Sequence, residues 1–75
     1  GKIAVYPNPT TDMLSVVTTL NNVQFTLFDL QGKKLRTVEN TKNAEIDMRN
    51  LSTGIYILQI SVDGKIYNKK ILKED

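Results

Sequence analysis

The 75-residue sequence contains no cysteine, no histidine and no tryptophan. Without cysteine it can form no disulfide and no thiolate metal site. The chain thereby also lacks the best nucleophile and the commonest general base, and Ser15, Ser52 and Ser61 have no candidate base beside them. We therefore expect no catalytic residue, no metal site and no cofactor, and we do not expect an enzyme.

Charge and hydropathy exclude further classes of protein. The formal net charge of +2 is too small to indicate binding to nucleic acid. No apolar run approaches the roughly 20 residues of a membrane-spanning helix, and no signal peptide is present. A chain of this length builds one thin core. We therefore expect a single domain over residues 1–75, with no deep pocket for a small-molecule substrate.

The longest apolar stretch, residues 55–62, follows a turn that ends at Gly54. Isoleucine is its commonest residue, and branched or aromatic side chains favour strands because they pack well on a pleated surface. The stretch lacks the 3.6-residue period of a helix. Alternate residues from Tyr56 onward are all apolar, whereas those from Ile55 onward are half apolar. This pattern predicts an interior strand whose Tyr56 face lies in the core.

Short alternating segments separated by turns make up the rest of the chain. No segment carries a helix signal. We predict strands at residues 3–6, 13–18, 23–30, 33–39, 44–48, 55–62 and 66–72. Seven short strands with this turn spacing predict an all-β fold, a seven-stranded antiparallel immunoglobulin-like β-sandwich.

Two corners carry recognisable turn chemistry. Leu51 is the one apolar residue in the corner before residues 55–62, and we expect it to close the end of the core. The spacing from Leu51 to Tyr56 resembles a tyrosine corner, in which the phenol bonds back to the backbone. Gly32 supplies positive φ to a hairpin turn, and the Asp29 carboxylate is placed to accept from its N–H groups. The aspartates match no EF-hand loop, and we interpret them as turn-capping residues.

The last predicted strand is rich in lysine. An Asp-Gly pair at residues 63–64 predicts a two-residue hairpin leading into it. Four of the ten basic residues follow within residues 65–73. They form either a solvated edge that resists pairing with another chain, or a recognition patch for an acidic partner or an anionic polysaccharide. Composition alone favours the solvated edge.

Phe28, Ile55 and Ile57 are expected on the outer faces of their strands. Either a neighbouring strand or loop covers them, or they form an exposed patch that marks a contact surface. The sequence leaves both possibilities open.

Several motifs follow one another along the chain. Residues 5–10 read VYPNPT, residues 27–33 read LFDLQGK, residues 46–56 contain IDM and LSTGIY, and residues 69–72 read KKIL. In order and spacing they resemble the YPNP, (V/I)YDLxG(R/K), IDLSxLxxGxY and KKI/V segments of the type IX secretion system C-terminal sorting domain. The resemblance covers nearly the whole chain and is greatest to the A-type subfamily.

This resemblance implies a secretion signal that catalyses nothing, on an immunoglobulin-like sandwich. Such domains end proteins of Bacteroidetes-type bacteria and direct an N-terminal passenger, absent from this chain, from the periplasm across the outer membrane. The implied partners are the type IX translocon, a sortase-like peptidase that usually removes the domain, and the passenger. Cargo is then anchored at the cell surface on lipopolysaccharide or released. We expect a monomer with no nucleic-acid or small-molecule partner.

The resemblance also suggests which residues act. The candidates for direct recognition are Lys69, Lys70, Ile71 and Leu72 in the last strand, and Pro7, Asn8, Pro9 and Gly32 in turns. The expected structural hallmarks are Leu51, Gly54, Tyr56 and Asp29. Two departures from the family pattern stand out. Phe28 replaces the usual Tyr, which indicates a packing role, and an acidic tail at residues 74–75 follows the basic-apolar segment.

A competing interpretation is an immunoglobulin-like or fibronectin-like accessory binding module of a larger secreted or surface enzyme. Such modules commonly contact carbohydrate through exposed aromatic residues, for which Tyr6, Phe28 and Tyr67 are available. Position separates the two interpretations, because a sorting domain ends its protein whereas an accessory module can lie anywhere.

Overall fold

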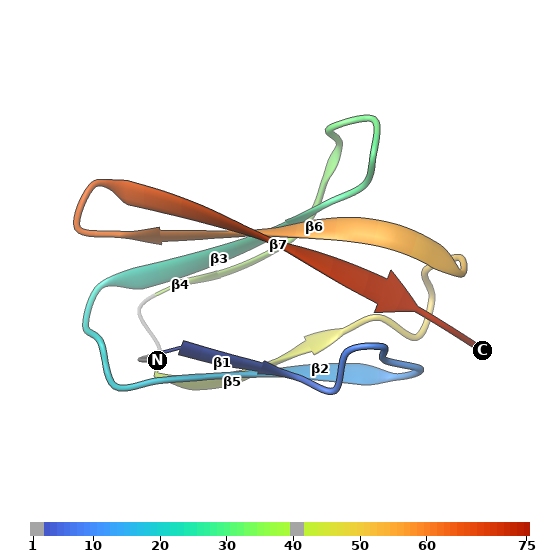
Figure 1. Cartoon of the computed structure of the whole chain (residues 1–75), viewed down its shortest axis with the longest axis horizontal. Helices are drawn as coiled ribbons and strands as arrows, with labels where there is room; N and C mark the ends of the chain where they lie inside the picture. The colour runs from blue at the N-terminus through green and yellow to red at the C-terminus, as the bar shows by residue number, and fades with distance from the viewer. Residues whose placement is uncertain (1–2, 40–41) are drawn as a thin grey trace.

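The computed structural model describes residues 3–39 and 42–75, which form two antiparallel β-sheets packed face to face (Figure 1). The smaller sheet has the order β1-β2-β5, with β1 at Ile3–Tyr6, β2 at Met13–Thr18 and β5 at Asn43–Asp47. The larger has the order β4-β3-β6-β7, with β4 at Lys34–Glu39, β3 at Val23–Phe28, β6 at Gly54–Val62 and β7 at Lys65–Lys73. The predicted seven-stranded all-β sandwich is confirmed.

Two-residue alternation places the core between the sheets. Residues facing inward from β2, β3 and β6 are almost completely buried, and Ile71 joins them from β7. The buried apolar core comprises Leu14, Val16, Val23, Phe25, Leu27, Ile46, Met48, Tyr56, Leu58, Ile60, Val62 and Ile71. Burying a side chain of this kind stabilises the fold by about 1.5–3 kcal/mol. As predicted, β6 is an interior strand and its Tyr56 face lies in the core.

Strand ends differ from the prediction by one or two residues, for local reasons. The register shifts between Leu27 and Phe28, and β3 ends there rather than at residue 30. Asp29 then closes the turn, because its Oδ1 accepts hydrogen bonds from the backbone N–H groups of Gln31 (2.9 Å) and Lys33 (2.8 Å). β7, by contrast, is longer than predicted and ends at Lys73, because Thr10 pairs with Lys73 there.

The corner between β5 and β6 is held by the residues that the sequence singles out. The Tyr56 hydroxyl donates a hydrogen bond to the Ser52 carbonyl oxygen at 2.5 Å, the backward contact expected of a tyrosine corner. Leu51 is half-buried against the core. Gly54 has φ of +146°, a conformation that side-chain-bearing residues rarely adopt. The corner therefore fixes where β6 begins.

The hairpin between β6 and β7 has the predicted two-residue turn. Asp63 and Gly64 have φ of 51° and 76°, and both values are positive as a type I′ turn requires. Within the part of the chain that the structure describes, no helix is long and apolar enough to cross a membrane.

The two ends of the sandwich differ in how they are closed. The end that we call the pinned end comprises residues 7–13, 29–34, 47–54 and 70–74, where loops and strand ends are joined by side-chain hydrogen bonds. The end that we call the open end comprises residues 18–23 and 62–67, together with Ile3. In Figure 1 the C-terminus marks the pinned end, and the β6–β7 hairpin marks the open end.

Candidate recognition surface

The segment after β1 lies along the free edge of β7 and is held there by Asn8. The Asn8 Nδ2 donates to the Lys70 carbonyl oxygen at 2.8 Å, and the Leu72 N–H donates to Asn8 Oδ1 at 3.0 Å. One side-chain amide thus satisfies two backbone groups, in the way that a neighbouring strand would. The contact joins residues 62 and 64 positions apart in the chain.

Thr10 continues this contact with its own backbone. Its N–H donates to the Leu72 carbonyl oxygen at 2.9 Å, and its carbonyl oxygen accepts from the Glu74 N–H at 2.8 Å. These bonds form a parallel bridge between Thr10 and Lys73. Thr10 is fully buried, and its Oγ1 donates to the Met13 carbonyl oxygen at 3.0 Å. The turn after β1 is therefore part of the sandwich edge.

This arrangement brings together two groups of residues that the sequence suggested separately. Lys70 and Leu72 are exposed on the outer face of β7, and the segment Pro7–Pro9 is exposed beside them. Lys69 is exposed on the opposite face of the same strand, where it borders the hollow between the sheets. We call this set of residues, 7–9 with 69, 70 and 72, the β7 surface. Ile71 lies between them in sequence but is 0% exposed, so its side chain packs in the core and supports the surface from beneath.

The β7 surface continues onto the outer face of the larger sheet. A shallow hollow of about 290 Å³ is lined by Asn8, Pro9, Ile55, Lys70 and Leu72. Ile55, which pairs with Leu72, is 39% exposed there. The outer face of β6 thus contributes exposed apolar surface next to the two recognition segments.

Gly32 lies farther along the same outer face. Its hairpin borders a second hollow, of about 460 Å³, which is lined also by Phe28, Ile57 and Asn68. Phe28 and Ile57 are paired in register, and each is half-buried. Gly32 itself is exposed and has φ of +88°. Neighbouring residues therefore cover Phe28 and Ile57 only in part. The exposed parts of these two side chains line an open hollow on the outer face.

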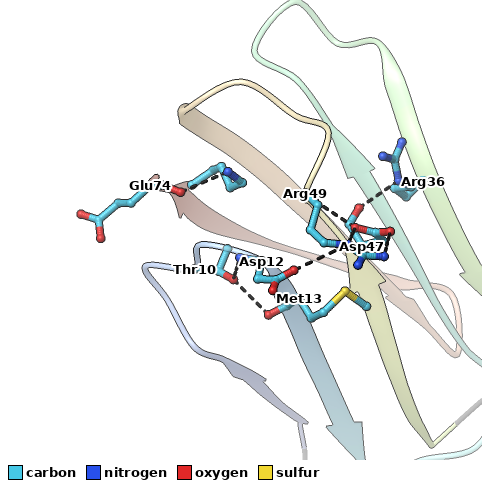
Figure 2. Close-up of polar contacts among 8 residues, drawn as sticks. Thr10, Asp12, Met13, Arg36, Asp47, Arg49 and Glu74 are labelled. Carbon is cyan, nitrogen blue, oxygen red and sulfur yellow. Dashed lines mark hydrogen bonds and ion pairs between the residues drawn. The ribbon is translucent and has the colours of Figure 1, made fainter.

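A polar cluster fixes the β1–β2 loop to the corner after β5 (Figure 2). Arg49 holds the Asp47 carboxylate through Nε to Oδ1 (3.0 Å) and Nη2 to Oδ2 (2.9 Å), and its Nε lies 3.6 Å from Asp12 Oδ1. The Asp12 carbonyl oxygen also accepts from the Met48 N–H at 3.0 Å. From β4, Arg36 Nε donates to the Asp47 carbonyl oxygen at 3.1 Å, a bond that ties the two sheets together.

Electrostatics in this cluster follow from the Arg49 contacts. Hydrogen bonds from the Arg49 side chain and backbone hold the pKa of Asp47 well below its usual range. In return, the Asp47 carboxylate raises the pKa of Arg49. Both side chains are exposed to solvent, so the pair locates the loop more than it stabilises the domain.

Several residues at this site were missed by reasoning from the sequence. Lys73 is 5% exposed, and its Nζ donates to the Glu74 carbonyl oxygen at 3.1 Å, whereas the sequence suggested a solvated lysine. The sequence indicates Asp12 only as a turn-capping residue and Thr10 only as the last residue of the VYPNPT motif. The one sequence feature that indicates this contact is Asn8 between Pro7 and Pro9. Its side-chain amide carries both a donor and an acceptor, and the two prolines restrict the backbone on either side. The strand that it contacts was not predictable from the spacing.

The charged residues of the described ranges do not gather as metal ligands do. Residues 3–39 and 42–75 contain no group of three or more aspartates or glutamates placed to hold an ion.

Comparison with protein families identifies the chain. The model of the secretion system C-terminal sorting domain matches residues 4–74, nearly the whole length. A comparison with curated proteins finds no match. The family match confirms the resemblance noted from the motifs, and the sandwich agrees with the fold that the resemblance implies. The chain belongs to the family of secretion system C-terminal sorting domains, which are the sorting signals of the type IX secretion system.

Proposed function

We propose that this chain is a single non-catalytic domain whose β7 surface is read by the type IX apparatus in the periplasm. An N-terminal passenger joined to the chain is then carried across the outer membrane. A sortase-like peptidase removes the domain, and the passenger is anchored at the cell surface or released.

The observation that carries this proposal is the contact between Asn8 and β7. It places the Pro7–Pro9 segment beside the exposed lysines of the last strand, with hydrogen bonds of 2.8 and 3.0 Å to the β7 backbone. A receptor that contacts this surface touches both ends of the chain at once. An unfolded or truncated domain lacks this juxtaposition, so the surface reports that the domain has folded.

Charge supports the same surface. Lys69 and Lys70 are adjacent and exposed, and within the described ranges neither forms an ion pair. Lysines on an edge strand keep it from recruiting other copies, and they also remain available to a partner with acidic groups. No comparison favours the alternative of a carbohydrate-binding accessory module.

The test is delivery of a reporter with this chain fused at its C-terminus, in a host that carries the type IX apparatus. The fusion is expected at the cell surface or in the medium, and the reporter alone is expected in the periplasm. The double variant Lys69→Ala with Lys70→Ala should leave most of the fusion in the periplasm. Both side chains are exposed, so the core is spared.

A matched control replaces two exposed lysines that lie outside the motif segments, Lys34→Ala with Lys42→Ala. This variant changes the net charge equally and should be delivered normally. Normal delivery of the Lys69/Lys70 variant, or equal loss in both variants, would contradict the role given to the β7 surface.

A further inference from the structure

We infer that the free edge of β7 at residues 66–70 is a docking site for an extended acidic segment of a partner protein, which adds to the larger sheet as a further strand. This inference rests on the proposed function for the partner's place in the secretion apparatus. Its evidence is the geometry of the edge itself.

The first observation is a row of backbone groups that face away from the sheet. Leu72 N–H and C=O both bond to the Asn8–Thr10 segment, on the side opposite β6. Because backbone direction alternates along an antiparallel strand, the same groups of Asn68 and Ile66 also point outward. Among the described residues no strand pairs with this edge, since β7 ends the order of its sheet. The outward groups of Ile66 and Asn68 and the N–H of Lys70 are therefore available.

The second observation is that the same edge already accepts a strand-like partner four residues farther on. Asn8 and Thr10 occupy the outward groups of Lys70, Leu72 and Glu74 with four hydrogen bonds of 2.8–3.0 Å. The chain thus fills one half of the edge and leaves the other half unfilled. An added strand on the unfilled half would continue the line that the Asn8–Thr10 segment begins.

The third observation is an apolar hollow beside the unfilled half. It has a volume of about 380 Å³ and lies between the sheets, where Ile3, Val5, Leu20, Ile60, Val62 and Tyr67 line it together with Asn68 and Lys69. Every second side chain of an added strand points to the inner side of the sheet. Those side chains would enter the hollow, so apolar residues are favoured at these positions of the partner.

Charge selects the partner over a second copy of this chain. Lys65, Lys69 and Lys70 are exposed along the edge, and none forms an ion pair within the described ranges. Pairing of two β7 edges would bring these lysines together, which is unfavourable. Lys65 and Lys69 pair with Val62 and Leu58 and so lie on the same face as the hollow, whereas Lys70 pairs with Ile57 and lies on the outer face. Apolar residues of the partner therefore fit the hollow, and the acidic residues that alternate with them lie on the face that carries Lys70. The occupant is therefore a segment of about five extended residues with alternating acidic and apolar side chains.

The test uses the whole 75-residue chain and an end-blocked peptide, Thr-Glu-Val-Asp-Val-Glu-Thr. A peptide with lysine in place of each acidic residue serves as the control. Binding is followed by amide hydrogen exchange. The amides of Ile66, Asn68 and Lys70 should exchange at least about tenfold more slowly with the acidic peptide, because they enter a ladder. Those of Leu72 and Glu74 should change little, because Asn8 and Thr10 already hold them.

Two variants isolate the edge. Asn68→Pro removes one outward N–H, and proline is tolerated on an edge strand, so peptide affinity should fall by about tenfold or more. Asn68→Ala keeps the N–H and should bind as the parent does. Lys69→Glu with Lys70→Glu leaves the backbone intact and should abolish the preference for the acidic peptide. Equal binding by Asn68→Pro and the parent, equal binding of both peptides, or protection confined to the Phe28–Ile57 hollow would overturn the inference.

Reporter delivery separates this inference from the proposed function. If Asn68→Pro loses peptide binding and also loses delivery, the edge serves the apparatus as inferred. If it loses peptide binding but is delivered normally, the inference is overturned and the proposed function stands. If the parent fusion is not delivered, the proposed function fails, and the peptide experiment alone decides whether the edge binds.

Discussion

The pinned end and the open end of the sandwich are built from the same seven strands but are closed by different means. At the pinned end, Asn8, Thr10, Asp12 and Arg49 fasten loops onto strand edges. At the open end, apolar side chains of both sheets line a hollow of about 380 Å³. β7 runs through both ends, from Tyr67, which is 51% exposed, to Ile71, which is completely buried.

This difference divides β7 into a half that other segments hold and a half whose edge is free among the described residues. The motifs at residues 5–10, 27–33, 46–56 and 69–72, on which the family resemblance rests, fall largely at the pinned end. Of their exposed members, residues 7–9, 69, 70 and 72 form the β7 surface. The open end carries fewer motif residues but leaves an edge unfilled. The half of the strand that Asn8 and Thr10 hold carries the proposed recognition surface, and the other half leaves backbone groups without a described partner.

The largest expected effect compares the two halves of β7 directly. Ile71→Ala removes a fully buried side chain and should lower the free energy of unfolding by about 2–5 kcal/mol, because a cavity remains in the core. Ile66→Ala, at a side chain that is 58% exposed, should change it by less than about 0.5 kcal/mol. Urea denaturation of both variants measures the difference. Equal losses would show that the two halves do not differ.

A smaller loss of unfolding free energy is expected when the Asn8 side chain no longer bonds to β7. Asn8→Ala removes two hydrogen bonds to the β7 backbone and should cost about 1–2 kcal/mol. The Leu72 amide should then exchange faster with solvent. The matched control Asn68→Ala truncates the same side chain where it makes no hydrogen bond within the described residues, and it should be nearly neutral. An unchanged Leu72 amide in Asn8→Ala would show that Asn8 does not hold the strand.

The tyrosine corner should contribute less again. Tyr56→Phe removes the hydrogen bond to the Ser52 carbonyl oxygen and should cost roughly 1 kcal/mol in unfolding free energy. Tyr67→Phe makes the same chemical change at an exposed side chain of the open end, where little effect is expected. Thermal melting of both variants compares the two ends. Identical melting temperatures of Tyr56→Phe and the parent would show that this hydrogen bond does not stabilise the domain.

The smallest effect concerns the pH dependence of the pinned end. Because Arg49 lowers the pKa of Asp47 in the folded state, the ionised pair adds stability above the unfolded pKa of about 3.9. This contribution should be lost as the pH falls through the lower folded pKa. Asp47→Asn keeps an acceptor oxygen but loses the charge.

Comparison of Asp47→Asn with the parent isolates that charge. The two proteins should differ in unfolding free energy near neutral pH and converge as the solution is acidified below about pH 4. Salt near 1 M should shrink the difference, since the pair is exposed and is screened. A difference in unfolding free energy that grows on acidification would contradict a stabilising role for the ionised Asp47.

The sequence predicted the fold well because alternation is a local signal. Tyr56, Leu58, Ile60 and Val62 mark the inner face of β6 by their spacing alone, and the Asp63-Gly64 pair marks the hairpin. β7 alternates poorly because its inner face meets the core only near Ile71. The strand was therefore placed correctly, but the contrast between its two halves was not foreseen.

The site was less accessible to sequence reasoning because its contacts span the chain. Asn8 was selected from a motif, yet its bond to Lys70 depends on which strand edge the loop meets in three dimensions. The burial of Lys73 depends on the same docking, since Thr10 covers the edge there. A lysine near the end of the chain gives no sequence signal that distinguishes it from its exposed neighbours.

Native-state hydrogen exchange along β7 tests the central contrast most directly. The amides of Leu72 and Glu74 should be protected in the free domain, because Asn8 and Thr10 accept from them. The amides of Ile66, Asn68 and Lys70 point the same way without a described partner, and they should exchange much faster. This pattern would show that one half of the edge is filled and the other is free. Uniform protection, or uniform exchange, at these five amides would contradict the account.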